Sequence, residues 1–262
     1  MAGSGSDKFG VIVVVIALCL PSDVLAQKKP AGAAHEVRVP FVGCASDGQV
    51  GPLEAPKGVD QVVQIEAGAA KRLAYYKSVN GPGVLGPRGW HCFGVYGSSG
   101  GNTFVSPVAH KPSEVFSDDW KVDEPAVDAE RILGSSGGRS YVAEVVARVF
   151  PTRRAFVQRI IAEFGGNESD FPFGPYPEDK LVYLSNSIVE FQTPPHTKGL
   201  GTSSWLRAND SPVNGVEILQ RDGSEDSDPD LISLSVRLPK TLNDLTLPII
   251  RQLERDNPPA KK

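Results

Sequence analysis

The sequence predicts an α+β fold in which a mainly antiparallel sheet, built with hairpins, packs against a few helices. Short apolar segments of strand length outnumber segments with helical periodicity, and several occur in pairs around a turn. Strands and helices do not alternate regularly, as they do in chains that build a parallel sheet. The 27 glycines and 22 prolines among 262 residues indicate many loops between short elements.

The beginning of the chain predicts an export signal. Residues 9–20 (FGVIVVVIALCL) are apolar, follow Lys8 and end before Pro21. This run has 12 residues, fewer than the ~20 that a membrane-spanning helix needs. We therefore expect a cleavable signal peptide over residues 1–26. The expected product is a soluble exported protein, periplasmic or secreted, with no membrane span after signal removal.

The cleavage site is predicted between Ala26 and Gln27, because Val24 and Ala26 place β-branched and small residues where signal peptidase reads them. A lipid anchor on Cys19 is an alternative, but Leu18 stands where a lipoprotein signal has a small residue. An uncleaved signal anchor is a second alternative, because the positive charge before the apolar run is weak.

The mature chain is expected to hold one domain. Residues 27–35 read as a flexible linker, residues 36–256 as a single α+β domain, and residues 257–262 as a disordered tail. Removal of the leader, with its one lysine and two aspartates, changes the formal charge from −4 to −3. This mild charge, without a basic block, argues against a nucleic-acid partner. The sequence points to no cofactor.

Two cysteines remain after the leader, Cys44 and Cys92. An even pair in an exported chain predicts a disulfide, since oxidising compartments favour its formation. Closing a loop of 48 residues is expected to contribute about 4 kcal/mol to the free energy of unfolding.

The first half of the chain is expected to be rich in strands. Apolar alternation, a hairpin turn and Gly/Pro runs mark the elements. They are strands over 36–42 and 62–65, a short helix over 67–77, an irregular segment over 81–89, and a hairpin of strands 90–96 and 102–106 around the turn 97–101.

The second half holds the strongest helical periodicity, between Tyr141 and Phe164. Apolar residues recur three and four apart on both sides of Pro151, which predicts two helices or one sharply kinked helix. The other elements are strands over 127–133, 181–184, 188–193, 216–221 and 231–238, and an amphipathic last helix over 242–256.

Cys92 is the sharpest candidate for a catalytic nucleophile. A thiolate needs a nearby base, and the chain offers His91 and, elsewhere, His35, His110 and His196. Adjacent residues in a strand point to opposite faces, so His91 is badly placed to activate Cys92. A half-cystine in a hairpin is the favoured interpretation.

The two GSSGG segments, 97–101 and 134–138, are candidates for a catalytic serine. A serine nucleophile needs a histidine and an acid placed to activate it, and no matching histidine motif is present. Glycine and serine runs are typical of turns, which is the favoured interpretation.

An acidic loop between the last two strands is a candidate calcium site through Asp222, Glu225, Asp226, Asp228 and Asp230. An EF-hand register that starts at Asp226 would need glycine where Leu231 stands. We interpret this loop as a solvated hairpin tip and expect no metal site.

Aromatic side chains in loops form the candidate ligand groove. The residues are Trp90, His91, Phe171, Phe173 and Tyr176, in the segments around RGWHCF and FPFGPYP. Loops carry binding residues more often than the scaffold does.

Several phrases resemble a family of exported bacterial proteins of unknown function. They are PFVGCASDGQVGPL at 40–53, LAYYKS at 73–78, GPRGWHCFGVYGSSG at 86–100, ARVFP at 147–151, FPFGPYPEDKLVY at 171–183 and SVRLP at 235–239. The resemblance implies a bacterial periplasmic or secreted setting and no activity.

The sequence therefore favours an exported binding or envelope-accessory module, whose partner is an envelope protein or a small ligand. The alternative is a secreted hydrolase with a cysteine or serine nucleophile.

Overall fold

The computed structural model describes Met1 and residues 34–116, 120–220 and 228–259. The predicted signal peptide and its cleavage site at Ala26 and Gln27 lie outside the described residues, apart from Met1. Residues Ala33–Lys262 form one compact unit, and the predicted domain 36–256 falls within it. None of the helices in the described part of the chain is long and apolar enough to cross a membrane.

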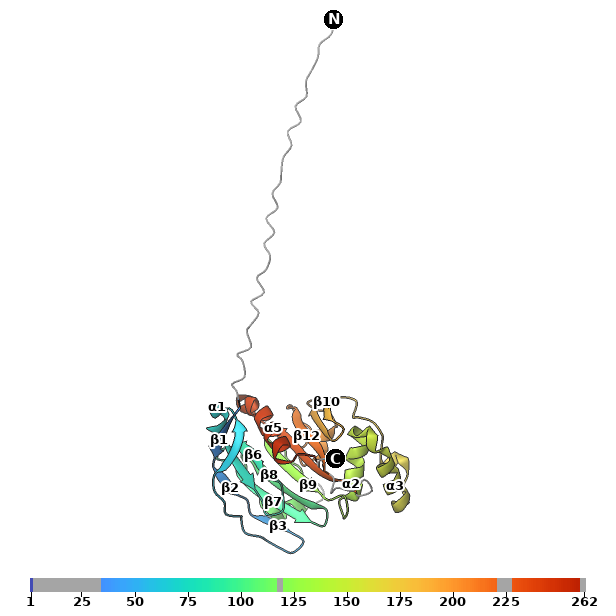
Figure 1. Cartoon of the computed structure of the whole chain (residues 1–262), viewed down its shortest axis with the longest axis horizontal. Coiled ribbons are helices and arrows are strands. Elements are labelled where there is room, and N and C mark those ends of the chain that lie inside the picture. Colours follow the sequence, from blue (N-terminus) through green and yellow to red (C-terminus); the bar gives the residue numbers. More distant parts are fainter. Residues whose placement is uncertain (2–33, 117–119, 221–227, 260–262) are drawn as a thin grey trace. The chain divides into compact units, whose positions relative to one another are not determined.

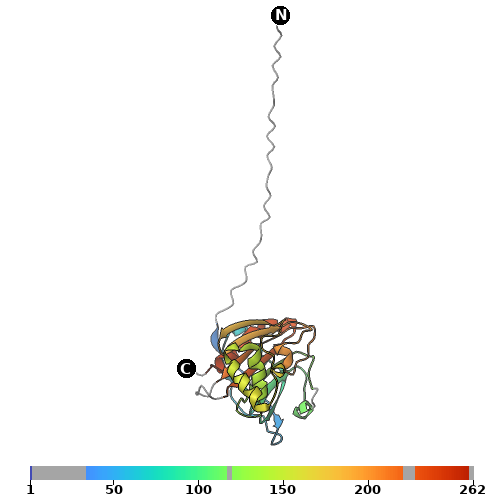
Figure 2. The ribbon, with the colours of Figure 1, turned by 90° about the vertical axis from the view of Figure 1, so that its right-hand side faces the viewer.

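The α+β class is confirmed, with mostly antiparallel strands and a few helices (Figures 1 and 2). An eight-stranded sheet forms the centre, and only its last pair, β7 with β3, is parallel. In spatial order its strands are β10 (Lys180–Ser185), β11 (Ile188–Thr193), β12 (Val213–Gln220), β13 (Asp230–Arg237), β9 (Ala126–Ile132), β8 (Gly100–Ser106), β7 (His91–Gly97) and β3 (Ser46–Gly48).

Two small sheets and the helices complete the fold. The small sheets are β1 (His35–Val39) with β4 (Gln61–Ile65), and β2 (Phe41–Gly43) with β5 (Leu73–Lys77) and β6 (Val84–Pro87). The α-helices are α1 (Ala67–Ala70), α2 (Arg139–Val149), α3 (Arg154–Phe164), α4 (Leu200–Ser203) and α5 (Thr246–Asp256). Short 3-10 turns span Pro112–Phe116, Pro151–Arg153, Glu168–Asp170 and Lys240–Leu245.

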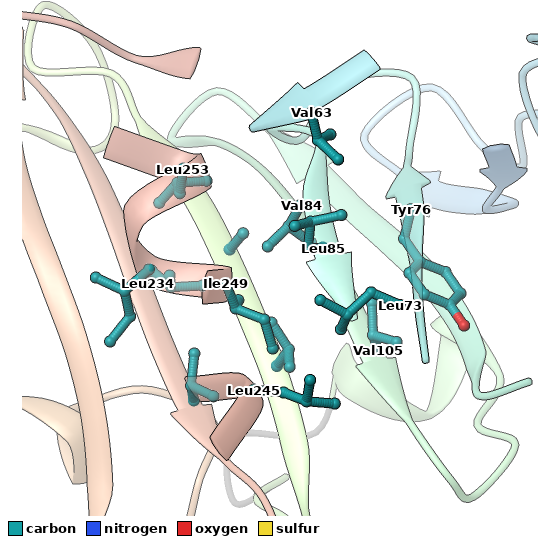
Figure 3. Close-up of a cluster of buried hydrophobic side chains, with 14 of the residues drawn as sticks. Val63, Leu73, Tyr76, Val84, Leu85, Val105, Leu234, Leu245, Ile249 and Leu253 are labelled. Carbon is teal, nitrogen blue, oxygen red and sulfur yellow. The ribbon is translucent and has the colours of Figure 1, made fainter. Parts of the chain in front are cut away.

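One face of the eight-stranded sheet, here the α5 face, is apolar throughout its centre. Leu245, Ile249 and Leu253 project from the last helical segment toward the sheet, and Figure 3 shows them beside Leu234 and opposite side chains of β5, β6 and β8. The cluster continues into both small sheets. The amphipathic stripe predicted for the last helix is therefore buried, and it contributes Leu245, Ile249 and Leu253 to this core.

The opposite face, here the α2 face, carries two separate apolar clusters. The helical cluster joins α2 and α3 to the sheet and to the loop after α3; its members include Ile132, Val142, Val146, Phe150, Ile160, Phe171, Val189, Leu219 and Leu231. The tryptophan cluster contains Phe93, Phe104, Val122, Ala126, Leu206 and Val213, with Trp120 and Trp205 packed against them. In Figure 2, α2 and α3 lie in front of the strands.

The predicted break between two helices is confirmed. Helix α2 ends at Val149, and Pro151 begins a 3-10 turn that leads into α3. Gly165 follows α3 with φ of 64°, a left-handed conformation that glycine adopts without steric cost.

Two predicted segments are wrong. The helix predicted over 67–77 ends after one turn, and Leu73–Lys77 forms the strand β5 instead. The segment 81–89, predicted to be irregular, contains the strand β6. Neither strand has an exposed residue, so their sequences lack the alternation that identifies a half-exposed strand.

The predicted disulfide between Cys44 and Cys92 is present, with the Cα atoms 5.3 Å apart. It joins the loop after β2 to β7 and therefore ties a small sheet to an outer part of the eight-stranded sheet.

Replacing both cysteines by serine is expected to lower the free energy of unfolding by about 4 kcal/mol, because the unfolded chain regains the freedom of a 48-residue loop. Urea unfolding with and without reductant measures this. Reduced wild-type protein is the control and should match the double variant. Equal midpoints for oxidised and reduced wild type would contradict the expectation.

Candidate functional site

A row of polar side chains crosses the middle of the α2 face. Asn102 on β8 lies opposite Glu130 on β9, and Glu130 lies opposite Ser233 on β13. Ser233 in turn lies opposite Glu217 on β12. Cross-strand partners share a face, so these four side chains project together. Asp128 joins them, because residues two apart in a strand point the same way. We call these five residues the polar row.

The polar row separates the two apolar clusters of this face. On one side, Phe104 of the tryptophan cluster lies opposite Asp128. On the other side, Ile132 of the helical cluster follows Glu130 by two positions in β9. The carboxyl groups are therefore held between hydrophobic surfaces, where ionisation is costly.

Two cavities lie over the polar row and meet at Tyr141, in the first turn of α2. The first has a volume of about 360 Å³ and is lined by Asn102, Glu130, Tyr141 and Trp205, together with Gly97, Gly100, Gly101, Gly137 and Gly138 of the GSSGG turns. The second has a volume of about 240 Å³ and reaches from Tyr141 toward α4 and the loop after α3; its other polar lining residues are Glu144, Arg148, Ser169, Asp170, Tyr176, Lys198, Ser203 and Glu217.

The two GSSGG turns pack against each other at the rim of the first cavity. Ser136 Oγ donates to the carbonyl of Ser98, and the backbone N–H of Leu133 donates to the carbonyl of Ser99 at 2.8 Å. At Gly100, φ is +131° and an added Cβ would lie 1.9 Å from the carbonyl oxygen of Arg131. These glycines allow the backbone segments to approach closely, which agrees with the interpretation of both motifs as turns.

Asp128 is buried, and Asn102 Nδ2 donates to its Oδ1 at 3.0 Å. Burial raises the pKa of Asp128 to about 7, although the hydrogen bonds from Asn102 and from the backbone of Trp205 act in the opposite direction. The hydrogen bond from the Trp205 backbone connects the polar row to the loop that carries the Trp205 indole ring.

Glu130 is partly accessible from the first cavity. The surrounding protein still excludes much of the water from Glu130. This burial is the larger cause, and the charge of Asp128 the smaller one, of a pKa that is raised to about 8. Glu130 therefore holds a proton through most of the physiological pH range.

Glu217 is the most buried residue that lines the second cavity, with 2% of its surface exposed. Ser233 Oγ donates to its Oε1 at 3.0 Å, whereas Oε2 is buried without a hydrogen-bond partner. Burial raises the pKa of Glu217 well above its usual range, and the charge of Glu130 adds to this.

Tyr141 is surrounded by these acids. Burial raises its pKa well above the usual value, and the nearby Glu130 and Glu217 raise it further. Its phenol therefore remains protonated and can donate a hydrogen bond into either cavity.

Arg237 holds the loop that places Trp205. Its side chain is 1% exposed and donates to three backbone carbonyls, those of Arg207 at 2.5 Å, Val122 at 2.9 Å and Glu124 at 3.3 Å. Burial lowers the pKa of this guanidinium. Through these bonds one buried cation joins two loops that are far apart in the sequence.

The five residues of the predicted groove are not brought together. Trp90 packs against the core of the α5 face, and His91 is exposed. Phe171, Phe173 and Tyr176 pack in the helical cluster on the α2 face. The prediction of one groove is therefore wrong, because the two loops reach opposite faces of the sheet; of the five, Tyr176 lines a cavity described here.

The histidines proposed as bases are placed elsewhere. His110 Nε2 lies 2.5 Å from Glu124 Oε1, and His196 Nε2 lies 2.8 Å from Asp210 Oδ1. His35 is exposed, as is His91. Cys92, bonded to Cys44, offers no thiolate in this state.

The proposed calcium loop falls largely outside the described residues, which lack 221–227. Of its two described acids, Asp228 pairs with Arg139, the N–O distance being 2.9 Å, and Asp230 pairs with Arg131 at 3.1 Å. Within the described parts of the chain, no group of three or more His, Cys, Asp or Glu side chains is arranged to hold a metal ion.

No family model, no curated protein and no solved structure matches this chain. The candidate site therefore rests on its own geometry.

Sequence reasoning missed the polar row, although each member stands in a segment predicted as a strand or beside one. A polar residue at every second position is the usual pattern of a solvated strand face. Asp128 and Glu130 in AVDAERI follow this pattern, as do Ser233 and Ser235 in DLISLSVR. One signal could have indicated the site: three separate strands carry acids or hydroxyls at positions that alternate with apolar residues.

Replacing Arg237 with methionine is expected to lower the free energy of unfolding by about 3–5 kcal/mol, because three buried carbonyls lose their donor. Urea unfolding followed by tryptophan fluorescence measures this. Arg38→Met, at an exposed position on β1, is the control and should change stability by less than about 0.5 kcal/mol. Equal losses for the two variants would show that the bonds of Arg237 contribute little.

The free energy of unfolding is expected to fall as pH rises from about 4 to about 8. Asp128 and Glu130 have pKa values of about 7 and about 8 in the folded protein, above the ~3.9 and ~4.3 of unfolded chains. Between these limits the folded state holds more protons than the unfolded state, so deprotonation favours unfolding. The slope is at most about 1.4 kcal/mol per pH unit for each carboxyl.

Urea unfolding at pH 5, 6, 7 and 8 tests this expectation. Glu130→Gln should flatten the pH dependence, since the amide does not titrate. Glu54→Gln removes a carboxylate at an exposed loop position and should leave the slope unchanged. Parallel slopes for the wild type and Glu130→Gln would rule out a raised pKa at Glu130.

Proposed function

We propose that this protein is an exported binding module that holds a small polar ligand in the two cavities over the polar row. The observation that carries the proposal is Glu217 Oε2, a buried carboxyl oxygen in a cavity wall that has no partner in the protein. A ligand in the cavity could supply that partner.

The protein loses stability by keeping Glu217 Oε2 without a partner. A buried polar atom without a partner costs about 1–3 kcal/mol, and folded proteins contain few of them. Acids with strongly shifted pKa values in a cavity are typical of binding and catalytic sites. Glu130, Glu217 and Tyr141 combine both features within one region of the sheet.

Binding is favoured over hydrolysis by a cysteine or serine nucleophile. Cys92 is engaged in the disulfide, and Ser98 and Ser136 contribute to the contact between two turns. The polar row offers hydrogen-bond donors and acceptors, which suit recognition of a ligand.

An exported setting, periplasmic or secreted, is part of the proposal. The predicted signal peptide supports it, and so does the disulfide, which oxidising compartments allow.

A thermal-shift screen of the mature protein against sugars, polyols, amino acids, amines and small carboxylates tests the proposal. At least one class is expected to raise the melting temperature. Tyr141→Phe and Glu217→Gln should each weaken the binding of that class by about tenfold, the loss of roughly one hydrogen bond.

Tyr183→Phe is the matched control, because it removes an exposed phenol on β10, outside both cavities. It should bind the hit as the wild type does. A ligand whose affinity is unchanged by both cavity variants would place binding elsewhere and overturn the proposal.

A further inference from the structure

We infer that the ligand of these cavities carries a positively charged amine, which lies over the polar row between Glu130 and Glu217 and against the rings of Tyr141 and Trp205. This inference rests on the proposed function and deepens it, because it names the chemical class of the ligand.

The first step is the balance of charge around the polar row. Within the described residues, no lysine, arginine or histidine forms an ion pair with Asp128, Glu130 or Glu217. Arg131, next to Glu130 in β9, lines the first cavity but pairs with Asp230 at 3.1 Å. Three acids therefore share one face without a positive charge from the protein.

The cations of the second cavity do not compensate these acids. Arg148 and Lys198 act on Glu144, where their charges lower a pKa that burial raises. Arg148 also donates to the carbonyl of Gly174 at 3.3 Å and lies 4.1 Å from the centre of the Tyr176 ring. Within the described residues, neither Arg148 nor Lys198 forms an ion pair with a member of the polar row.

The second step is the unpartnered acceptor. Glu217, with 2% of its surface exposed, lines the second cavity, and its Oε2 is buried without a hydrogen-bond partner. Its other oxygen already accepts from Ser233 Oγ. An ammonium group carries three N–H donors and no acceptor, which matches a wall that offers carboxyl oxygens.

The third step is the aromatic lining. Tyr141 and Trp205 both line the first cavity, together with Glu130. The faces of such rings attract a cation, and the attraction strengthens where water is excluded. A volume of about 360 Å³ accommodates a small organic amine.

Binding of the amine should release a proton. In the free protein Glu130 holds a proton at neutral pH, since its pKa is about 8, and burial also raises the pKa of Glu217. An ammonium ion next to one of them favours its carboxylate, so a carboxyl O–H bond breaks and the proton passes to solvent. No proton leaves the amine. Other titratable and charged groups that face this region are Tyr96, Asp128, Arg131, Tyr141, Glu144, Arg148, Asp170, Tyr176 and Lys198.

Isothermal titration calorimetry of the full mature protein tests this inference. The probes are n-butylamine and 1,4-diaminobutane, with 1-butanol and 1,4-butanediol as neutral counterparts of the same shape and butyrate as an anion. At pH 7 the amines are expected to bind at least tenfold more tightly than the alcohols. Titrations in buffers of different ionisation enthalpy should show release of about one proton, and amine affinity should rise from pH 6 to pH 8.

Glu130→Gln and Glu217→Gln should each lower amine affinity at least tenfold and reduce the proton release. Glu54→Gln, the exposed control, should bind as the wild type does. Thermal unfolding of each variant verifies that it is folded, and Tyr141→Phe provides a second cavity variant that leaves every carboxyl in place.

The possible outcomes separate the two proposals. Equal affinity for amines and alcohols, absence of proton release, or wild-type affinity in Glu130→Gln would overturn the amine inference. Binding of a neutral or anionic compound that depends on Tyr141 would retain the proposed function and reject only the amine. Absence of any binding that depends on the cavity variants would reject both.

Discussion

Burial of carboxyl groups in the middle of one sheet face is the constraint on which the candidate site depends. Moving an acid out of water is costly unless it is paired or keeps its proton. Here Asn102 and Ser233 supply hydrogen bonds, and the raised pKa values keep protons on the acids. The two cavities lie over this row, between the apolar clusters on either side of it.

The two faces of the large sheet divide stability and recognition between them. The α5 face is continuously apolar, and α5 with the small sheets covers it, so it contributes hydrophobic stabilisation without a polar interruption. The disulfide reinforces this side by closing a long loop. The polar row therefore interrupts only one of the two apolar faces, and packed elements on both faces support the candidate site.

Local patterns predicted much of the fold. The break at Pro151, the antiparallel pairing of β7 with β8 and the buried stripe of the last helix all follow from periodicity and from glycine and proline positions. The strands β5 and β6 were missed because neither has an exposed residue, which removes alternation. The predicted groove from Trp90 to Tyr176 failed for a different reason: residue type indicates that an aromatic ring will pack, but not on which face of a sheet.

The sequence by itself determined the α+β class, most strand and helix positions, and the cysteine pair, because each depends on neighbours along the chain or on composition. Only the tertiary structure decided the candidate site. Asn102, Glu130, Ser233 and Glu217 become neighbours through the strand order β8-β9-β13-β12, which no local pattern specifies. Whether a polar residue on a strand faces solvent or a cavity depends on what packs over it, and here that is α2 and the loop held by Arg237.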